Sequence, residues 1–335
     1  MSDRKTIAFW CEKHDATIDT GAEFHVNLWH FSSKKRSDFF EIGVLVDDPS
    51  ALSAIKIFVP FDLNYDQIRD LGGEFSEPNL AQGIFNEALS PAFAVNKRSV
   101  ELLLGGKTYC GVHVFAAGKN GIDPNELNLK ATDGGTLLEI TAAAIVSLAR
   151  QYDDARRGYF RLRLLSKKPS ERPFVTYIAP QDRAWTSGFD AIEYIDCRLN
   201  EARTLPQSVA RAAESSPNGV AETRQVVFLA VVPVVSAITL SHAEWHKSRL
   251  LENEIWERYV PAGLDAGMVV YHWRRIFTDL ESKPLQGFSA FVKLQTRKAD
   301  FPIIGLYIGL SLLIGVLGSV FGSFALSFFL SGSGP

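Results

Sequence analysis

The sequence predicts a mainly β protein, sandwich-like or a twisted antiparallel sheet, with a smaller α+β unit and one C-terminal transmembrane helix. Three observations support this fold class. Apolar and polar residues alternate in several stretches before residue 205, a polar segment interrupts the pattern at 206–223, and residues 301–330 carry no charge. Alternation with a period of two is typical of half-buried strands, and a bilayer span needs about 20 apolar residues.

These stretches divide the chain into four segments. We expect a β-rich cytosolic domain at 1–205, a linker or long loop at 206–223, a small α+β juxtamembrane unit at 224–300 and a transmembrane helix at 301–330. Hydrophobic residues make up 46% of the chain and charged residues 22%, which predicts a packed core rather than disorder.

The first segment alternates clearly at Phe24, Val26 and Leu28, and the same period recurs at 55–61 and 160–164. Residues 136–149 are apolar and fit either a buried helix or a long strand. Further strands are expected at 39–46, 100–104, 109–116, 174–178 and 191–197, and short helices at 65–71 and 80–89.

The juxtamembrane unit begins after a segment that carries polar turn formers and no clear core residues. Residues 226–240 are too short to span a bilayer comfortably and contain Pro233, so we expect a buried strand pair or a strand and turn. Leu251, Ile255 and Tyr259 have helical spacing, which predicts a helix at 246–260. Strands are expected at 268–273 and 288–294.

Charge and cysteine content exclude two classes of protein. The formal net charge of -3 gives no basic field that would attract nucleic acid. Cys11, Cys110 and Cys197 are far apart and odd in number, which argues against a disulfide scaffold and fits a reducing compartment. Only residues 7–10 form an apolar run near the N-terminus, so we expect no signal peptide and a body that stays in the cytosol.

The uncharged run at 301–330 exceeds the length of one span and is too short for two. Pro302 stands at the expected helix start, where its missing N–H is harmless. A buried helix of a soluble domain and a shallow re-entrant hairpin that breaks near Gly315 or Gly318 are the alternatives. The span is flanked on its N-terminal side by three basic residues, Lys293, Arg297 and Lys298.

The positive-inside rule therefore places the N-terminal side in the cytosol. The layout is that of a single-pass, tail-anchored protein, and we expect the membrane to be a bacterial inner membrane.

Small residues recur along this run at four-residue spacing. Helices in lipid associate through close backbone packing over small residues, so the pattern predicts a homo-oligomer in the bilayer. A serine stripe that faces water in a pore, or the ordinary abundance of glycine in such helices, would also explain it. The expected packing residues are Gly305, Gly309, Ser311, Gly315, Gly318, Ser319, Gly322, Ser323 and Ser327.

Catalytic and metal-binding motifs do not emerge from the sequence. Lys107 and Thr108 follow two glycines as in a phosphate-binding loop, but Glu101 stands where that loop needs its first glycine, so a hairpin turn is expected. His242 and His246 have helical metal-ligand spacing, but Ala243 stands where a metalloprotease needs glutamate. We therefore assign no catalytic residue, no metal site and no cofactor.

One basic cluster is a candidate anion-binding site. Arginines crowd the region before and within the strand expected at 160–164, and such a cluster can bind a nucleotide or lipid headgroups. A solvated edge strand is the alternative interpretation. The residues are Arg156, Arg157, Arg161 and Arg163.

In layout only, the chain is similar to membrane effectors of bacterial defence and toxin systems, in which a cytosolic sensing domain is fused to a terminal span. The similarity implies a role in antiviral defence, with a cytosolic protein or small ligand as trigger and the lipid bilayer as target. Helix association would then perturb the bilayer. A passive membrane-anchored adaptor and a membrane-tethered enzyme with an unrecognised site are the other hypotheses.

Overall fold

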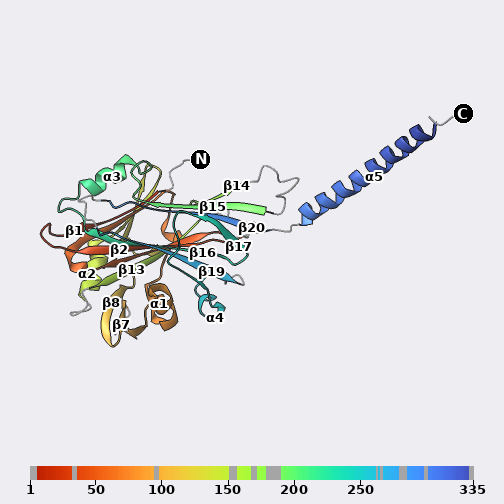
Figure 1. Ribbon diagram of the computed structural model, residues 1–335. Coiled ribbons are helices and arrows are strands. Elements are labelled where there is room, and N and C mark those ends of the chain that lie inside the picture. The colour runs from red at the N-terminus through yellow and green to blue at the C-terminus, as the bar shows by residue number, and fades with distance from the viewer. Residues whose placement is uncertain are drawn as a thin grey trace.

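The computed structural model describes most of the chain and forms two large β-sheets with one long helix at the C-terminal end (Figure 1). The prediction of a mainly β protein with a C-terminal helix is confirmed. The described residues are 6–31, 36–93, 98–150, 157–166, 172–178, 190–261, 263–264, 267–278, 285–297 and 301–331.

The eight-stranded sheet is antiparallel except where β1 runs parallel to β15. Its β14 lies beside β15, off the main path of the sheet. The order is β11 (Leu127–Thr132), β12 (Gly135–Ile140), β4 (Leu52–Val59), β1 (Thr6–Lys13), β15 (Asp190–Leu199), β20 (Phe288–Arg297) and β17 (Ser236–Ser241), with β14 at Val175–Ile178.

The ten-stranded sheet is mixed, because β16 runs parallel to β2 and β13 runs parallel to β8. The order is β18 (Lys247–Leu250), β19 (Met268–Ile276), β16 (Glu222–Pro233), β2 (Gly21–Trp29), β3 (Phe39–Val46), β13 (Gly158–Leu165), β8 (Lys107–His113), β7 (Ser99–Leu104) and β6 (Leu89–Phe93), with β5 (Ile68–Asp70) beside β13. A small ribbon of β9 (Ala117–Gly118) and β10 (Gly121–Ile122) completes the strands.

The two sheets pack face to face over the largest hydrophobic core. Phe9 of β1 stacks on Phe24 of β2 with ring centroids 4.4 Å apart, and this contact joins one sheet to the other. Successive side chains of a strand point to opposite faces, so Phe24, Val26 and Leu28 enter this core together. The arrangement is a sandwich. Apolar and polar residues alternate along β2 because every second side chain points into the core between the sheets.

The other face of the ten-stranded sheet is also covered. Trp29 and Phe39 pack there against Trp256 and Tyr259, beside the short helix α4 (Asn253–Trp256). The helix α1 (Pro78–Phe85) and the 3-10 turn η3 (Gly72–Ser76) cover the neighbouring strands. The strand β2 therefore has neighbours on both faces, and its polar residues His25 and Asn27 are buried. The remaining short elements are η1 (Pro49–Ala51), η2 (Tyr65–Gln67), α2 (Ala142–Ala149) and α3 (Gln207–Glu214).

The segment predicted as a linker, 206–223, differs from the expectation. It holds α3, whose Val209 and Ala213 are buried against Trp10 and Phe58. Apolar residues four apart lie on one face of a helix, and this face packs on the eight-stranded sheet. The strands that follow do not form a separate unit, because β16 pairs with β2 and β20 pairs with β15.

Other local predictions were wrong where strand pairing prevailed over helical spacing. Residues 246–260 contain β18, which pairs with β19, followed by the short α4. Residues 65–71 contain a 3-10 turn followed by β5 rather than one helix. The ambiguous stretch 136–149 contains both structures, since β12 ends at Ile140 and α2 begins at Ala142. Residues 226–240, predicted as a buried strand pair or a strand and turn, hold most of β16, a turn and most of β17; the two strands lie in different sheets and do not pair with each other.

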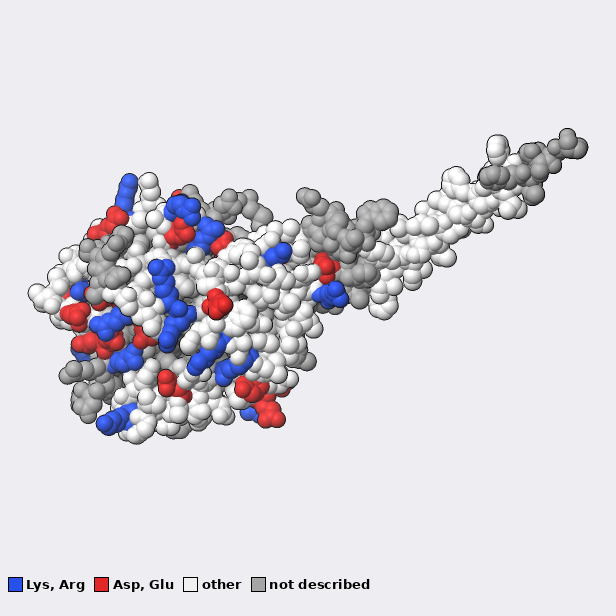
Figure 2. Space-filling model, viewed as in Figure 1, with Lys and Arg blue, Asp and Glu red and all other residues white. Residues whose placement is uncertain are grey.

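The C-terminal helix α5 (Phe301–Ser331) projects away from the sandwich (Figure 1). Its stretch Ile304–Phe328 is strongly apolar, with a mean hydropathy of 2.2, and is 0% buried by the rest of the protein. Figure 2 shows Lys, Arg, Asp and Glu side chains mixed over the sandwich and none on the visible face of α5. A helix of 25 residues rises about 37 Å at 1.5 Å per residue, enough to cross a bilayer core of about 30 Å. The helix supports a single-pass membrane protein.

Candidate functional site

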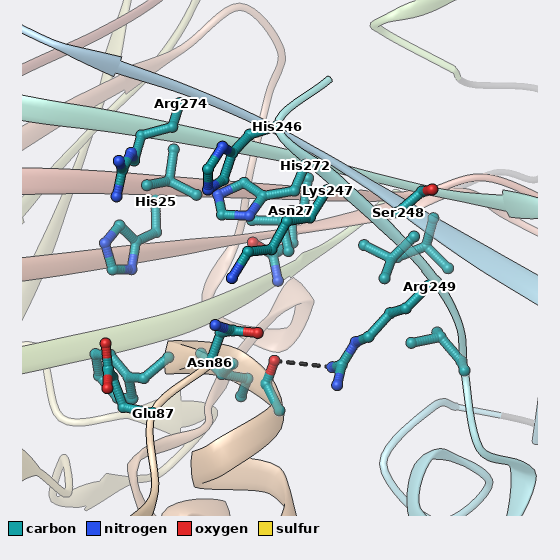
Figure 3. A pocket seen from close by; sticks show the side chains of 18 of the residues that line it. His25, Asn27, Asn86, Glu87, His246, Lys247, Ser248, Arg249, His272 and Arg274 are labelled. Atoms are coloured by element: carbon teal, nitrogen blue, oxygen red, sulfur yellow. Dashed lines mark hydrogen bonds between the residues drawn. The ribbon is translucent and has the colours of Figure 1, made fainter. Parts of the chain in front are cut away.

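A groove opens on the outer face of the ten-stranded sheet, between the strands β2, β16 and β19 and the end of α1 (Figure 3). Its cavity volume is about 470 Å³. Small-molecule sites typically enclose roughly 300–1,000 Å³. The groove is therefore large enough for a small organic ligand.

Alternation along β2 supplies the floor of this groove. Glu23, His25, Asn27 and Trp29 line the cavity, whereas the residues between them face the core of the sandwich. Because β2 is a central strand with both faces covered, His25 is 7% exposed and Asn27 is 5% exposed. Buried polar side chains in the middle of a sheet require partners, and here they border a cavity.

Three histidines border the groove. His246 and His272 lie with ring centroids 5.8 Å apart, and His25 Nδ1 lies 3.4 Å from the Tyr159 hydroxyl. Burial, together with the positive charges of His246, His25, Arg274 and Lys247, lowers the pKa of His272 to about 4. This ring is therefore neutral at pH 7 and is surrounded by positive potential.

Basic side chains at the groove outnumber acidic ones. The two acidic residues of the lining are Glu23 and Glu87, and Glu23 already pairs with Arg157 at 2.6 Å. Burial raises the pKa of Glu23, but the hydrogen bonds and charges of His25 and Arg157 outweigh it, so the pKa lies below its ordinary value. The four basic residues of the lining are Arg161, Lys247, Arg249 and Arg274.

Several residues that line the groove carry buried polar atoms without a hydrogen-bond partner. Among the described residues, eight buried side-chain nitrogen or oxygen atoms have no hydrogen-bond partner, and four of them belong to residues that line this cavity. A buried polar atom without a partner costs about 1–3 kcal/mol, so such atoms are rare unless a ligand or water satisfies them. The four atoms are Asn27 Oδ1, Trp29 Nε1, Arg161 Nε and His272 Nε2.

An ion cluster lies beside the groove. Glu41 accepts hydrogen bonds from Arg161 Nη2 at 2.6 Å and from Arg163 Nη2 at 2.7 Å. The Tyr259 hydroxyl donates to the same carboxylate at 2.8 Å. Burial raises the pKa of Glu41, but the two guanidinium groups outweigh it and hold the pKa below its ordinary value. Two cations thus share one anion in the interior, and Arg161 extends the positive charge to the groove.

The three described members of the predicted anion-binding cluster, Arg157, Arg161 and Arg163, do not form one surface. Arg157 pairs with Glu23 and lies 3.6 Å from Asp47. Arg163 forms an ion pair with Glu41, and its guanidinium lies over the rings of Phe39 and Tyr259. Arg161 is the member of the cluster that lines the groove. Arg156 lies outside the described residues.

Sequence reasoning did not assign His25, His246 or His272 to a binding site. Residues 246–260 were assigned to a helix, whereas Lys247–Leu250 form the edge strand β18, which places Lys247 and Arg249 at the groove. Lys247 pairs with His272 across β18 and β19, and Asn27 lies two strands from His272, on β2. Figure 3 shows these side chains on one wall of the groove, with Asn86 at the end of α1 across from them. One signal was present in the sequence: Glu23, His25 and Asn27 alternate with core residues along β2, which marks a buried polar face.

The predicted packing residues of α5 have free space around them. A side-chain carbon added at Gly305, Gly309, Gly315, Gly318 or Gly322 would meet nothing within 4 Å. Ser323 Oγ donates to the Ser319 carbonyl at 2.9 Å, and Ser327 Oγ donates to the Phe324 carbonyl at 2.9 Å. Among the flanking residues, Lys293 and Arg297 lie on β20, and Lys298 lies outside the described residues.

The remaining motifs have structural roles. Gly105 and Gly106 have φ angles of 59° and 81° and form the expected hairpin turn between β7 and β8. In the described part of the chain, no group of three metal-ligating side chains is positioned to hold an ion.

Comparison with known proteins gives little guidance. No family model matches the chain, and no curated protein matches it. Among solved structures, it is similar to the Fcho1 Mu homology domain of Danio rerio with bound Eps15 peptide, at 12% sequence identity over 84% of this chain and 79% of that chain. The TM-score is 0.17, and a similarity this low carries no argument about function.

Proposed function

We propose that this protein is a membrane-anchored binding module whose groove takes a small anionic ligand. The observation that carries the proposal is the pair of buried, unpaired donors, Trp29 Nε1 and Arg161 Nε, on residues that line one cavity with a basic lining. An anion with several oxygen acceptors would accept hydrogen bonds from Trp29 Nε1 and Arg161 Nε. Lys247, Arg249 and Arg274 would supply the charge around it.

Phosphate-bearing molecules fit this chemistry best. Arginine and lysine recognise phosphate oxygens, and Trp29 and Trp256 offer apolar surface for an attached organic group. The Arg249 guanidinium already lies 5.8 Å from the Trp256 ring centroid and donates to the Gly83 carbonyl at 2.9 Å. These contacts hold it at the edge of the groove.

Two adjacent arginines give a matched test. Arg274 lines the groove, whereas the next residue on the strand, Arg275, donates to the Gly287 carbonyl at 3.2 Å and lies over Phe277. Isothermal titration of the full chain in detergent, with ATP and inorganic triphosphate as probes and adenosine as the uncharged control, should give saturable binding of a charged probe. Arg274→Gln should weaken that binding by about tenfold, which corresponds to about 1.4 kcal/mol, and Arg275→Gln should leave it unchanged.

Failure of both charged probes to bind, or equal loss in the two variants, would contradict an anion site in this groove.

The module would act at the membrane through α5. In this proposal the body is cytosolic, the ligand is a trigger, and α5 associates with other copies over its Gly and Ser positions to perturb a bacterial inner membrane. The four-residue spacing of its glycines supports close packing of a second helix, and no other described part of the chain covers them. A passive adaptor, in which α5 only anchors the body, is the second candidate and is separated from the first by the sequence dependence of α5.

A further inference from the structure

Several strands of both sheets end on the side of the sandwich from which α5 leaves (Figure 1). The strand β20 ends at Arg297, and α5 begins at Phe301. Pairing places Ser236 of β17 opposite Thr296, and Ile178 of β14 opposite Ile192 near the start of β15. Asp190, the first residue of β15, pairs with Arg297. The turn between β16 and β17 and the end of β14 therefore lie at this end.

Apolar side chains are exposed along this end. In the turn that joins β16 to β17, Val234 is 55% exposed and Val235 is 65% exposed. On β14, Tyr177 is 51% exposed and Ile178 is 43% exposed. We call these four residues the apolar rim. Isolated exposed apolar residues are common, but two groups of them at the same end of a molecule, here on β14 and in the β16–β17 turn, indicate an interaction surface.

The connection between β20 and α5 is short, so the apolar rim lies close to the start of α5. Four residue steps separate Arg297 from Phe301, and an extended chain reaches at most about 3.6 Å per residue, so their Cα atoms lie within about 14 Å. Neighbouring strands are about 4.8 Å apart, which places the β16–β17 turn at the same level beside β20. When α5 spans a bilayer, this end of the sandwich lies at the bilayer surface.

The composition of this end also suits a lipid interface. Arg297 is 91% exposed and Lys293 lies on the same strand, where both can meet anionic headgroups. Tyrosine is enriched at the level of the headgroups, where its ring is half immersed. We propose that the apolar rim inserts into the headgroup region of the membrane that α5 crosses and so fixes the orientation of the sandwich on the bilayer.

This inference rests on α5 as a span and is independent of any ligand in the groove. It predicts that the sandwich lies against the membrane in one orientation and does not reorient freely about its connection to α5. The orientation would hold the groove at a constant height above the bilayer, and movement of the rim would act directly on the start of α5.

Site-directed fluorescence can test the rim in the full chain. Cys11, Cys110 and Cys197 are all buried, and burial raises the pKa of each thiol, so an added surface cysteine can be labelled selectively. Val235→Cys and Ile178→Cys would carry an environment-sensitive dye in vesicles of phosphatidylcholine and phosphatidylglycerol. Ile18→Cys, 37% exposed and before the start of β2, is the control at the other end of the sandwich. Val316→Cys reports insertion of α5.

We expect lipids brominated on their acyl chains to quench the dye at Val235 and Ile178 at least twofold more than at Ile18, and aqueous iodide to show the reverse order. Quenching by brominated lipid at Val316 together with full iodide access at Val235 and Ile178 would overturn the rim proposal alone. Absence of lipid quenching at Val316 as well would overturn both the span and the rim. Two rim positions are used so that local misfolding of one cysteine variant does not decide the result.

Discussion

Arg161 Nη2 lies 2.6 Å from Glu41 Oε2, with the Arg161 side chain 1% exposed and the Glu41 side chain 0% exposed. Arg163 binds the other oxygen of the same carboxylate. The cluster holds β3 to β13 by charge as well as by the backbone ladder, and it brings a cation to the wall of the groove. Because one anion serves two buried cations, the carboxylate is the member whose loss matters most.

Glu41→Gln should therefore destabilise the body strongly. The variant keeps the shape of the side chain but leaves two buried guanidinium groups without an anion, and breaking a buried pair in this way costs about 3–5 kcal/mol. Denaturant unfolding followed by tryptophan fluorescence measures the change in the free energy of unfolding. Glu201→Gln is the control, since its partner Arg203 is 83% exposed, and it should cost less than about 1 kcal/mol. Equal effects in the two variants would contradict this account of the cluster.

His30 should make stability depend on pH above neutrality. It lies between Asp38 and Glu193, with Nδ1 2.9 Å and Nε2 3.2 Å from their oxygens, and so joins the ten-stranded sheet to β15. Burial disfavours the charged ring, but the two carboxylates outweigh burial and raise its pKa from 6.5 to about 9. The folded protein therefore binds more protons than the unfolded chain between these values. The resulting stabilisation is complete below pH 6.5 and is lost as the pH rises to 9.

The shift corresponds to about 3 kcal/mol, since one pKa unit is 1.36 kcal/mol. Unfolding by guanidinium at pH 6, 7, 8 and 9 should show this loss in the parent chain. In His30→Gln the stability should be lower at pH 6 and nearly level from pH 6 to pH 8, above which the buried thiols of Cys11, Cys110 and Cys197 add a loss that all variants share. His14→Gln, which changes an exposed ring, should follow the parent. A His30→Gln protein that loses stability as steeply as the parent would rule out His30 as the source.

His272 should couple ligand binding to a proton. Burial and the surrounding positive groups hold its pKa at about 4, and Nε2 has no partner. An anion in the groove would oppose that positive potential and raise the pKa, so binding would take up a proton. Affinity for the charged probe should then increase as the pH falls from 7 to 5, by at most tenfold per pH unit for one linked proton.

Titration calorimetry in two buffers of different ionisation enthalpy measures this proton uptake. His272→Gln should reduce the uptake to whatever the probe itself and the other groove histidines contribute. Unchanged uptake in His272→Gln would show that the proton binds elsewhere.

The strands of the sandwich were predictable because the alternation of apolar and polar residues that indicates a strand is a local property of the sequence. Phe24, Val26 and Leu28 alternate with polar residues whatever their partners are, and the uncharged run of α5 is recognisable without tertiary information. The groove was not predictable in the same way. Its floor forms where β16 pairs in parallel with β2, so that Leu229 lies beside Asn27 although 202 positions separate the two residues in the chain. No local spacing indicates that pairing, and β18 was included in a predicted helix because Leu251, Ile255 and Tyr259, which follow it, have helical spacing.

The sequence dependence of α5 separates an effector from a passive anchor. If copies of α5 pack over their glycines, Gly315→Leu or Gly318→Leu should abolish depolarisation of bacteria expressing the full chain while leaving membrane insertion intact, because a leucine side chain keeps the backbones apart. Leu312→Ala is a control with the opposite change in size at an exposed position. Membrane potential read with a voltage-sensitive dye gives the result, with the chain ending at Asp300 as the baseline. Retained depolarisation in both glycine variants, or in a polyleucine α5, would contradict packing over the glycines, and a full chain that inserts without depolarising the cell would favour the adaptor.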